Sequence, residues 1–218
     1  MWLKNQGIRM THEYEFVLGL DECGRGALAG PISVGCALVQ VGTDSYWWSR
    51  GAKDSKKLSY NKRVTFYRDF IYDTHPTPSA YHIAYQPSSA VDALGISKAT
   101  QICVWDCLNR MIRQYGDQIT TVFFDRGLKP RSAELHLPDH IQVIEADKDG
   151  ESKWASVAIA SILAKVERDC YMEKLGSQYP QYKFEDHKGY GSEVHRQAIK
   201  QHGVIQEIHR TTFCKNFL

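Results

Sequence analysis

The order of the apolar segments is the feature that most constrains this fold. Two β-rich runs, residues 14–20 and 32–41, lie on either side of a glycine-rich stretch, and they predict two strands joined by a turn. A helix capped by Ser59 follows and ends before Pro76, and then come a strand at 80–85 and a helix opened by Ser97. Two further strands are predicted at 120–124 and 141–144. The last elements are a helix that follows Gly150 and ends before Pro180, and a helix from Ser192 to about His202. This order, β-β-α-β-α-β-β-α-α, predicts a single α/β domain over residues 1–218 with a mixed sheet. We expect a core at about residues 14–175 and a helical region at about 176–218.

Two of these segments carry finer expectations. The runs 120–124 and 141–144 are β-branched and aromatic, which predicts buried strands. After Gly150, a helical stripe runs through Trp154, Val157, Ala158, Ser161, Ile162 and Lys165. Small residues in its first half make this helix thin enough to lie close against a sheet: Ala155, Ala158, Ala160, Ser161 and Ala164.

Composition excludes several classes of protein. With 218 residues, 43% hydrophobic and 24% charged, the chain is typical of a soluble globular protein and not of a disordered one. No apolar run approaches the ~20 residues of a membrane span, and the first residues carry no signal-peptide core. The six cysteines show neither a disulfide framework nor zinc-ligand spacing, so we expect a reducing cytoplasm. The net charge of +2 indicates no particular partner.

Carboxylates follow the predicted strands. Asp21 and Glu22 end the first strand, Asp125 ends the 120–124 strand, and an acidic cluster follows the 141–144 strand: Glu145, Asp147, Asp149 and Glu151. Acids at the ends of neighbouring strands converge on one edge of a sheet. Their repulsion requires a divalent cation, and oxygen ligands suit Mg²⁺ or Mn²⁺. Two such ions ~3.5–4 Å apart are suited to attack on a phosphodiester.

A second interpretation of these acids is that they are solvated loop residues. For Asp125 alone that interpretation is favoured, whereas the glycines after Glu22 argue against it for the first pair. Neighbours in a strand point to opposite faces, so Asp21 and Glu22 share a site only if the strand ends near Glu22. Glu151 lies in the first turn of a helix, which fits a metal ligand and a capping residue equally well.

Basic segments surround these acids in the sequence. Residues 50–68 carry seven Lys or Arg side chains and only one acid, which indicates either a solvated helix face or a phosphate site. Residues 186–191 place His187 and Lys188 just before Tyr190, which stands between two glycines, so Tyr190 either stacks on a sugar or base or packs on its own domain. The histidines, His187, His195, His202 and His209, are expected to be structural or close to phosphate.

Six blocks of this sequence resemble the ribonuclease HII family. They are G-L-D-E-C-G-R-G-A-L-A-G-P (19–31), D-S-K-K-L (54–58), F-F-D (123–125), A-S-I-L-A-K-V-E-R-D (160–169), H-K-G-Y-G (187–191) and H-R-T-T-F (209–213). The blocks occur in the family's order and span most of the chain. The resemblance implies an RNase H-like mixed five-stranded sheet flanked by helices, with a C-terminal helical region. It also implies a metal-dependent endonuclease that hydrolyses RNA in RNA–DNA hybrids and cuts duplex DNA 5′ of an embedded ribonucleotide, leaving 3′-hydroxyl and 5′-phosphate ends.

The resemblance assigns roles to individual positions. Asp21, Glu22 and Asp125 match three metal-binding carboxylates. The residues matching the elements that sense the ribose 2′-hydroxyl and the junction phosphate are Gly24, Arg25, Gly26 and Tyr190, with Lys56 and Lys188 as phosphate contacts. A reader of the 2′-hydroxyl is required because that group alone distinguishes RNA from DNA at the cut site.

Two positions depart from the family pattern. Arg126 replaces the usual glycine after the third carboxylate, where its charge can bias the metal site. Glu151 stands ten residues before Ser161, where the family usually has aspartate, and this resembles ribonuclease HIII. We expect Glu151 to be the fourth metal ligand, with Asp149 and Asp147 as alternatives.

Two other functions stay open. One is a ribonuclease HIII-like enzyme that cuts only hybrids with several ribonucleotides, although the G-R-G form and the lack of that family's N-terminal extension favour HII. The other is a non-catalytic hybrid-binding protein. We expect a monomer with no membrane contact, and residues 213–218 are too short to be interpreted as a clamp-binding peptide.

Overall fold

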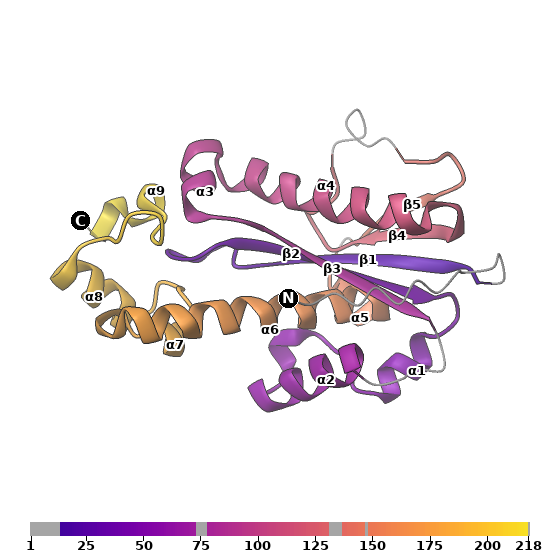
Figure 1. The fold of residues 1–218 in the computed structure, drawn as a ribbon, viewed down its shortest axis with the longest axis horizontal. Coiled ribbons are helices and arrows are strands. Elements are labelled where there is room, and N and C mark those ends of the chain that lie inside the picture. Colours follow the sequence, from indigo (N-terminus) through magenta and orange to yellow (C-terminus); the bar gives the residue numbers. More distant parts are fainter. Residues whose placement is uncertain (1–13, 73–77, 131–136, 147, 218) are drawn as a thin grey trace.

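A five-stranded mixed sheet forms the centre of the molecule (Figure 1). The computed structural model describes residues 14–72, 78–130, 137–146 and 148–217. The strands, in the sheet order β3-β2-β1-β4-β5, are β3 (Ser79–Gln86), β2 (Ile32–Gln40), β1 (Phe16–Cys23), β4 (Ile119–Phe124) and β5 (Gln142–Glu145). The first three strands are antiparallel, while β1–β4 and β4–β5 are parallel, which confirms the predicted mixed sheet.

Helices cover both faces of the sheet (Figure 1). The helices are α1 (Asp44–Ser49), α2 (Tyr60–Tyr72), α3 (Ser88–Leu94), α4 (Ile96–Tyr115), α5 (Gly150–Lys153), α6 (Ala155–Gln178), α7 (Phe184–His187), α8 (Glu193–His202) and α9 (Thr211–Cys214). Helices α3 and α4 lie on one face, and α6 with α1 and α2 lies on the other. None of the helices within the described ranges is long and apolar enough to cross a membrane.

Helix α6 lies very close to β1 and β2, as its small residues predicted. A Cβ atom at Gly35 would lie 2.6 Å from the Ala160 carbonyl oxygen. A Cβ at Gly19 would overlap the α6 backbone at Ser156 and Val157. Both contacts are below the shortest separation of real Cβ atoms, so the two strands need glycine where α6 crosses them.

Several predictions about local structure were wrong. The segment 141–144 was expected to be buried, but β5 is the last strand of the sheet: only Ile141 is buried, Gln142 is exposed, and Val143 and Ile144 are half-buried. Trp154 was placed within one helix, but it has extended backbone angles that separate α5 from α6. Its ring stacks on Phe123 with a centroid distance of 4.4 Å, and this packing outweighs the helical pattern. Helix α3, immediately before α4, was not predicted.

The predicted cap at Ser59 is confirmed, because Lys62 N–H donates to Ser59 Oγ at 3.4 Å just before α2. The helix predicted from Ser192 to about His202 is α8, and Ser192 Oγ accepts the His195 N–H at its start. Helix α6 ends at Gln178, before Pro180, as expected.

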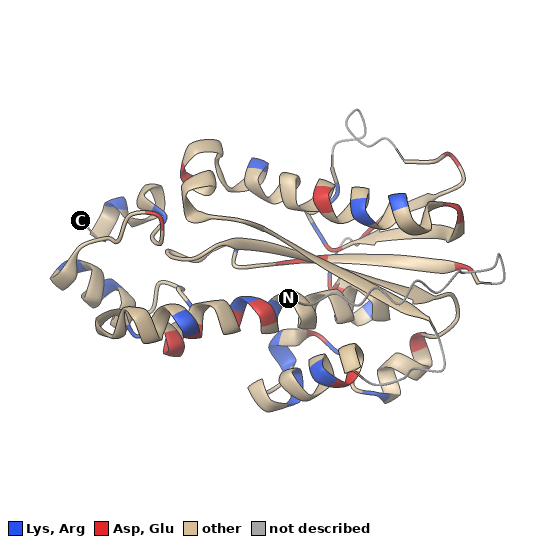
Figure 2. Cartoon of the chain, in the orientation of Figure 1, with Lys and Arg blue, Asp and Glu red and all other residues tan. Residues whose placement is uncertain are grey.

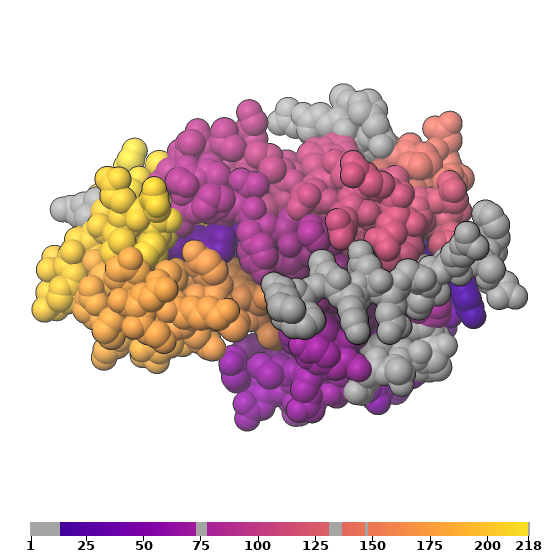
Figure 3. Space-filling model, in the orientation of Figure 1, coloured from indigo at the N-terminus to yellow at the C-terminus, as the bar shows by residue number. Residues whose placement is uncertain are grey.

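The C-terminal helices pack on the glycine-rich turn between β1 and β2. Leu28 and Ala29 of this turn share an apolar cluster with Met172 of α6 and with Tyr182 and Phe184. In the space-filling view the C-terminal residues (yellow) lie against α3 (magenta) and the α6–α7 segment (orange), closing this end of the sheet (Figure 3).

The contact between α6 and the sheet generates a stability prediction. Gly35→Ala pushes a methyl group against the Ala160 carbonyl, so we expect a loss of about 1–3 kcal/mol in the free energy of unfolding. Urea denaturation measures this loss. Gly26→Ala is the matched control, because a Cβ at Gly26 meets nothing within 4 Å, and its unfolding midpoint should match the wild type. Equal stability of both variants would contradict the close packing of α6.

Candidate active site

Acidic side chains interrupt an otherwise uncharged sheet (Figure 2). The five strands carry only three Asp, Glu, Lys or Arg residues: Asp21 and Glu22 in β1 and Glu145 in β5. Asp125 directly follows β4. The pairing of β1 with β4 ends at Leu20 and Phe124, and Asp125 N–H then donates to the Leu20 carbonyl at 3.1 Å. The three acids therefore meet where the β1–β4 ladder ends.

Asp21 and Glu22 lie among the last three residues of β1, which ends at Cys23, so the condition that the strand ends near Glu22 is met. β1 continues to pair with β2 as far as Cys23. On its other side, β1 no longer pairs with β4 beyond Leu20, and Glu22 N–H donates instead to Asp21 Oδ1 at 2.7 Å. One carboxylate oxygen each from Asp21, Glu22 and Asp125 lies within 4.8 Å of the others.

The environment of these carboxylates opposes their negative charge. Burial raises the pKa of Asp21 well above its usual value, and the charges of Glu22 and Asp125 raise it further, while a hydrogen bond with Ser161 acts in the opposite direction. Burial and the Asp125 charge also raise the pKa of Glu22, against the lowering effect of Arg25 and Lys56. Such repulsion between carboxylates is relieved by a bound cation.

Lys56 supplies positive charge beside the acids. Burial alone would lower its pKa, but the charges of Asp21, Glu151, Asp54 and Asp125 raise it above the usual value. Its backbone N–H donates to Asp54 Oδ1 at 2.9 Å, which fixes the short 3₁₀ turn Ser55–Lys57.

Glu151 lies beside the three acids. Gly150 N–H donates to Asp125 Oδ1 at 3.1 Å, which holds the start of α5 against Asp125. Glu151 is buried, and burial together with the charges of Asp125 and Asp54 raises its pKa. The carboxylate group within 4.8 Å consists of Asp21, Glu22 and Asp125, so Glu151 flanks this group.

The alternatives to Glu151 are less well placed or lie outside the structure. Asp149 is exposed and has a left-handed backbone with φ of 51°. Asp147 lies outside the described residues. Glu145 Oε1 accepts the N–H of Gly127, and Arg126 is exposed in the turn that follows Asp125.

The donor set fits a divalent cation. It consists of three carboxylates on neighbouring strands, with ligand oxygens close together and charges that repel each other in a partly buried position. Hard oxygen ligands of this kind suit Mg²⁺ or Mn²⁺ better than the softer metals that select sulfur.

The glycine loop, residues 24–30, follows the acids and is held by two buried arginines. Gly24 has φ of 92°, and a Cβ there would overlap the guanidinium group of Arg168. The Arg168 side chain has no exposed surface, and it donates to the carbonyls of Ala29, Pro31 and Lys188 at 2.9–3.0 Å. These bonds join the glycine loop to the segment that carries Tyr190.

Arg210 holds the other side of the glycine loop. It donates to the carbonyls of Arg25 and Gly30 at 3.0 and 3.1 Å. Burial and the charge of Arg168 lower the pKa of Arg210 to about 10. The carbonyls of Arg25, Ala29 and Gly30 thus point toward the two arginines, while the Arg25 and Gly26 residues themselves are exposed.

Tyr190 lies against this loop. Its hydroxyl lies close to the Gly24 backbone and to Cys23, and its ring centroid lies 5.4 Å from the Arg168 guanidinium carbon. Burial and the neighbouring Cys23 raise the pKa of Tyr190 to about 12, so its hydroxyl is neutral near pH 7. The residue is nevertheless 37% exposed, which leaves part of its ring accessible.

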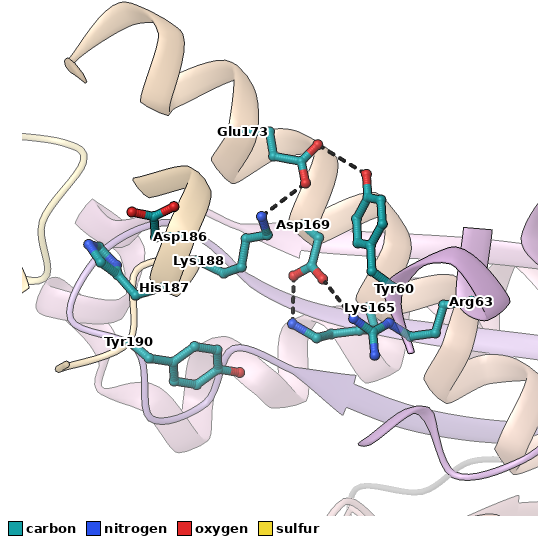
Figure 4. Close-up of a pocket in the computed structure, with 9 residues that line it drawn as sticks. All are labelled: Tyr60, Arg63, Lys165, Asp169, Glu173, Asp186, His187, Lys188 and Tyr190. Carbon is teal, nitrogen blue, oxygen red and sulfur yellow. Dashed lines mark hydrogen bonds and ion pairs between the residues drawn. The ribbon is translucent and has the colours of Figure 1, made fainter. Parts of the chain in front are cut away.

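Tyr190 also lines a cleft of about 590 Å³ between α2, α6 and α7 (Figure 4). The predicted phosphate contact Lys188 lies in this cleft, where Nζ is 2.9 Å from Glu173 Oε1 and also donates to the Glu185 carbonyl. Asp169 pairs there with Lys165 and Arg63. The cleft cations are therefore paired with acids of α6.

Sequence reasoning missed the two arginines. Both lie inside blocks quoted for their resemblance, but an arginine on a helix or in a loop is usually exposed. The sequence alone held no signal for their role. Buried backbone carbonyls need hydrogen-bond donors, but which carbonyls of the glycine loop are buried is known only from the folded structure.

Known proteins resemble this chain over most of its length. A sequence model described as Ribonuclease HII matches residues 18–216. A ribonuclease HII of Caldicellulosiruptor bescii is 34% identical over 209 residues, covering 96% of this chain and 91% of that protein. One from Staphylococcus carnosus is 38% identical over 197 residues, covering 90% of this chain and 67% of that protein.

Solved structures share the fold. The RNase HII of Archaeoglobus fulgidus, solved in complex with PCNA, has a TM-score of 0.71 at 23% identity and covers 92% of this chain and 96% of that one. Bst-RNase HIII, solved with Mn²⁺, has a TM-score of 0.64 at 19% identity and covers 94% and 69%. The fold, the carboxylate group and the sequence match agree: this chain belongs to the ribonuclease HII family and is a type 2 ribonuclease H, an endonuclease that hydrolyses RNA–DNA hybrids.

Proposed function

We propose that this enzyme recognises a single ribonucleotide within duplex DNA and cuts on its 5′ side, leaving 3′-hydroxyl and 5′-phosphate ends, in addition to cutting hybrids. The observation that carries the proposal is that the carboxylates and the glycine loop lie next to each other. Glu22 and Gly24 are two residues apart, and the hydroxyl of Tyr190 lies close to the Gly24 backbone.

Recognition of one ribose requires a group that contacts the 2′-hydroxyl close to the reacting phosphate. Exposed Arg25 and Gly26 present backbone and cationic groups to a nucleic-acid strand, and the partly exposed ring of Tyr190 offers a surface for the sugar. Arg168 and Arg210 keep this surface rigid through the loop carbonyls, which supports discrimination at a fixed distance from the acids.

Asp21, Glu22 and Asp125, with Glu151 beside them, would hold Mg²⁺ or Mn²⁺, in a two-ion arrangement if Glu151 contributes. Divalent ions at such a site activate water and stabilise the charge on the phosphate and the departing 3′-oxygen. The Glu22 N–H fixes the Asp21 carboxylate, which Ser161 adjoins, and the Gly150 N–H fixes the carboxylate of Asp125. Lys56 holds positive charge beside the acids, where it can contact a phosphate of the substrate. Lys188 lies in the cleft that Tyr190 lines and would contact a phosphate only by exchanging its ion pair with Glu173.

The role of Asp125 can be tested without disturbing the fold. In Asp125→Asn the amide oxygen still accepts the Gly150 N–H, but the negative charge is lost. We expect the cleavage rate of an RNA–DNA hybrid to fall by about 100-fold or more, because the cation loses a charged ligand, while hybrid binding in a filter assay is nearly unchanged.

Asp149→Asn is the matched control for this experiment. Asp149 is exposed, and asparagine tolerates its left-handed backbone. Its cleavage rate should equal that of the wild type. Wild-type turnover by Asp125→Asn, or an equal loss in both variants, would remove Asp125 from the site.

The proposed specificity is tested with a DNA duplex that contains one ribonucleotide, compared with an all-DNA duplex and a duplex with four ribonucleotides. We expect cleavage on the 5′ side of the single ribonucleotide in Mg²⁺ or Mn²⁺ and none of all-DNA. A DNA polymerase should extend the upstream product, since it carries a 3′-hydroxyl.

The other outcomes have distinct meanings. Cleavage of the four-ribonucleotide duplex alone would show a ribonuclease HIII-like specificity. Binding of both ribonucleotide-containing duplexes without cleavage in either metal would show a hybrid-binding protein.

A further inference from the structure

Two buried histidines next to the proposed recognition surface have no part in the chemistry described above. His195 of α8 is completely buried and His209 is 1% exposed. His195 Nε2 lies 3.2 Å from His209 Nε2, so one ring donates to the other. A buried pair of this kind requires one defined set of protons.

The neighbouring backbone fixes where those protons lie. Ile205 N–H donates to His209 Nδ1 at 2.9 Å, so the neutral His209 ring carries its proton on Nε2. That proton points to His195 Nε2, which must then be the acceptor. His195 consequently carries its proton on Nδ1, which lies 3.0 Å from the carbonyl oxygen of Tyr190.

We propose that His195 and His209 are positioning residues that set Tyr190 against the glycine loop through a hydrogen-bond relay of fixed direction. The relay runs from Ile205 N–H through His209 and His195 to the Tyr190 carbonyl. It rests on the proposed function, because it assumes that Tyr190 contacts the nucleic acid.

The relay begins in the segment that also holds the glycine loop. Arg210, directly after His209, donates to the carbonyls of Arg25 and Gly30. His209 forms a backbone bridge with Ala29 of the same loop. Adjacent residues of one segment thus hold the two halves of the recognition surface, the glycine loop through Arg210 and Tyr190 through His209 and His195.

The Tyr190 carbonyl accepts a second hydrogen bond, from Ser192 N–H at 2.8 Å. That bond belongs to the turn before α8 and survives substitution of His195. The relay therefore adds a restraint on Tyr190 through His195 of α8 and His209. Without the relay, Tyr190 is displaced but the turn before α8 remains.

The test uses the whole enzyme with an RNA–DNA hybrid substrate. His195→Phe keeps an aromatic ring but can neither donate nor accept a hydrogen bond, and His195→Asn places an amide donor where Nδ1 was. We expect His195→Phe to lower kcat/KM by about tenfold and His195→Asn by less than about threefold. His202→Phe, at the exposed end of α8, is the control and should match the wild type.

A double-mutant cycle separates positioning from general destabilisation. In a Tyr190→Ala background, His195→Phe should change kcat/KM by less than about twofold, since the residue it positions is gone. An equal loss in both backgrounds, or no loss in the wild-type background, would overturn the relay. Wild-type kcat/KM for Tyr190→Ala itself would instead overturn the proposed role of Tyr190, and the relay with it.

A measurement on the unmutated protein covers the case in which His195→Phe does not fold. Imidazole ¹⁵N NMR near pH 7 should show the Nε2–H tautomer for His209 and the Nδ1–H tautomer for His195. The Nε2–H tautomer at His195, or a charged ring at either position, would contradict the direction of the relay.

Discussion

The close approach of α6 to β1 and β2 is the contact on which the rest of the structure depends. Gly19 and Gly35 remove side chains from the sheet where the alanine-rich start of α6 crosses it. Because the helix lies this close, one of its faces reaches the carboxylates through Ser161 and the glycine loop through Arg168. The same helix carries the acids that pair with the cleft cations (Figure 4). A single helix therefore sets the geometry of both the catalytic acids and the recognition surface.

A group of negative charges and a group of positive charges lie in separate places close to this helix. Asp21, Glu22 and Asp125 repel each other at the end of the β1–β4 ladder. Arg168 and Arg210 place two buried positive charges behind the glycine loop and direct their hydrogen bonds to its carbonyls. The net charge of +2 is a sum and gives no information on where these charges lie. A bound divalent cation would make the substrate-facing surface more positive.

Much of the fold could be predicted from the sequence because the apolar runs and caps are local signals. The mixed sheet, the cap at Ser59 and the thin helix are confirmed. The break at Trp154 depends on a stacking partner in β4, which no local pattern contains. The meeting of Asp21 and Glu22 could not be derived from strand alternation, because it depends on where β4 stops pairing. The clamp by Arg168 likewise depends on loop carbonyls that are distant in sequence.

The central claim is that the three carboxylates form the cation site, and calorimetric unfolding with and without Mn²⁺ tests it most directly. Asp21→Asn keeps an oxygen for the Glu22 N–H but removes a buried, repelled charge. Without metal this variant should unfold about 2–4 °C above the wild type, corresponding to about 1 kcal/mol. Mn²⁺ should raise the unfolding temperature of the wild type and leave that of Asp21→Asn nearly unchanged. An equal rise in both proteins would show that the cation binds elsewhere.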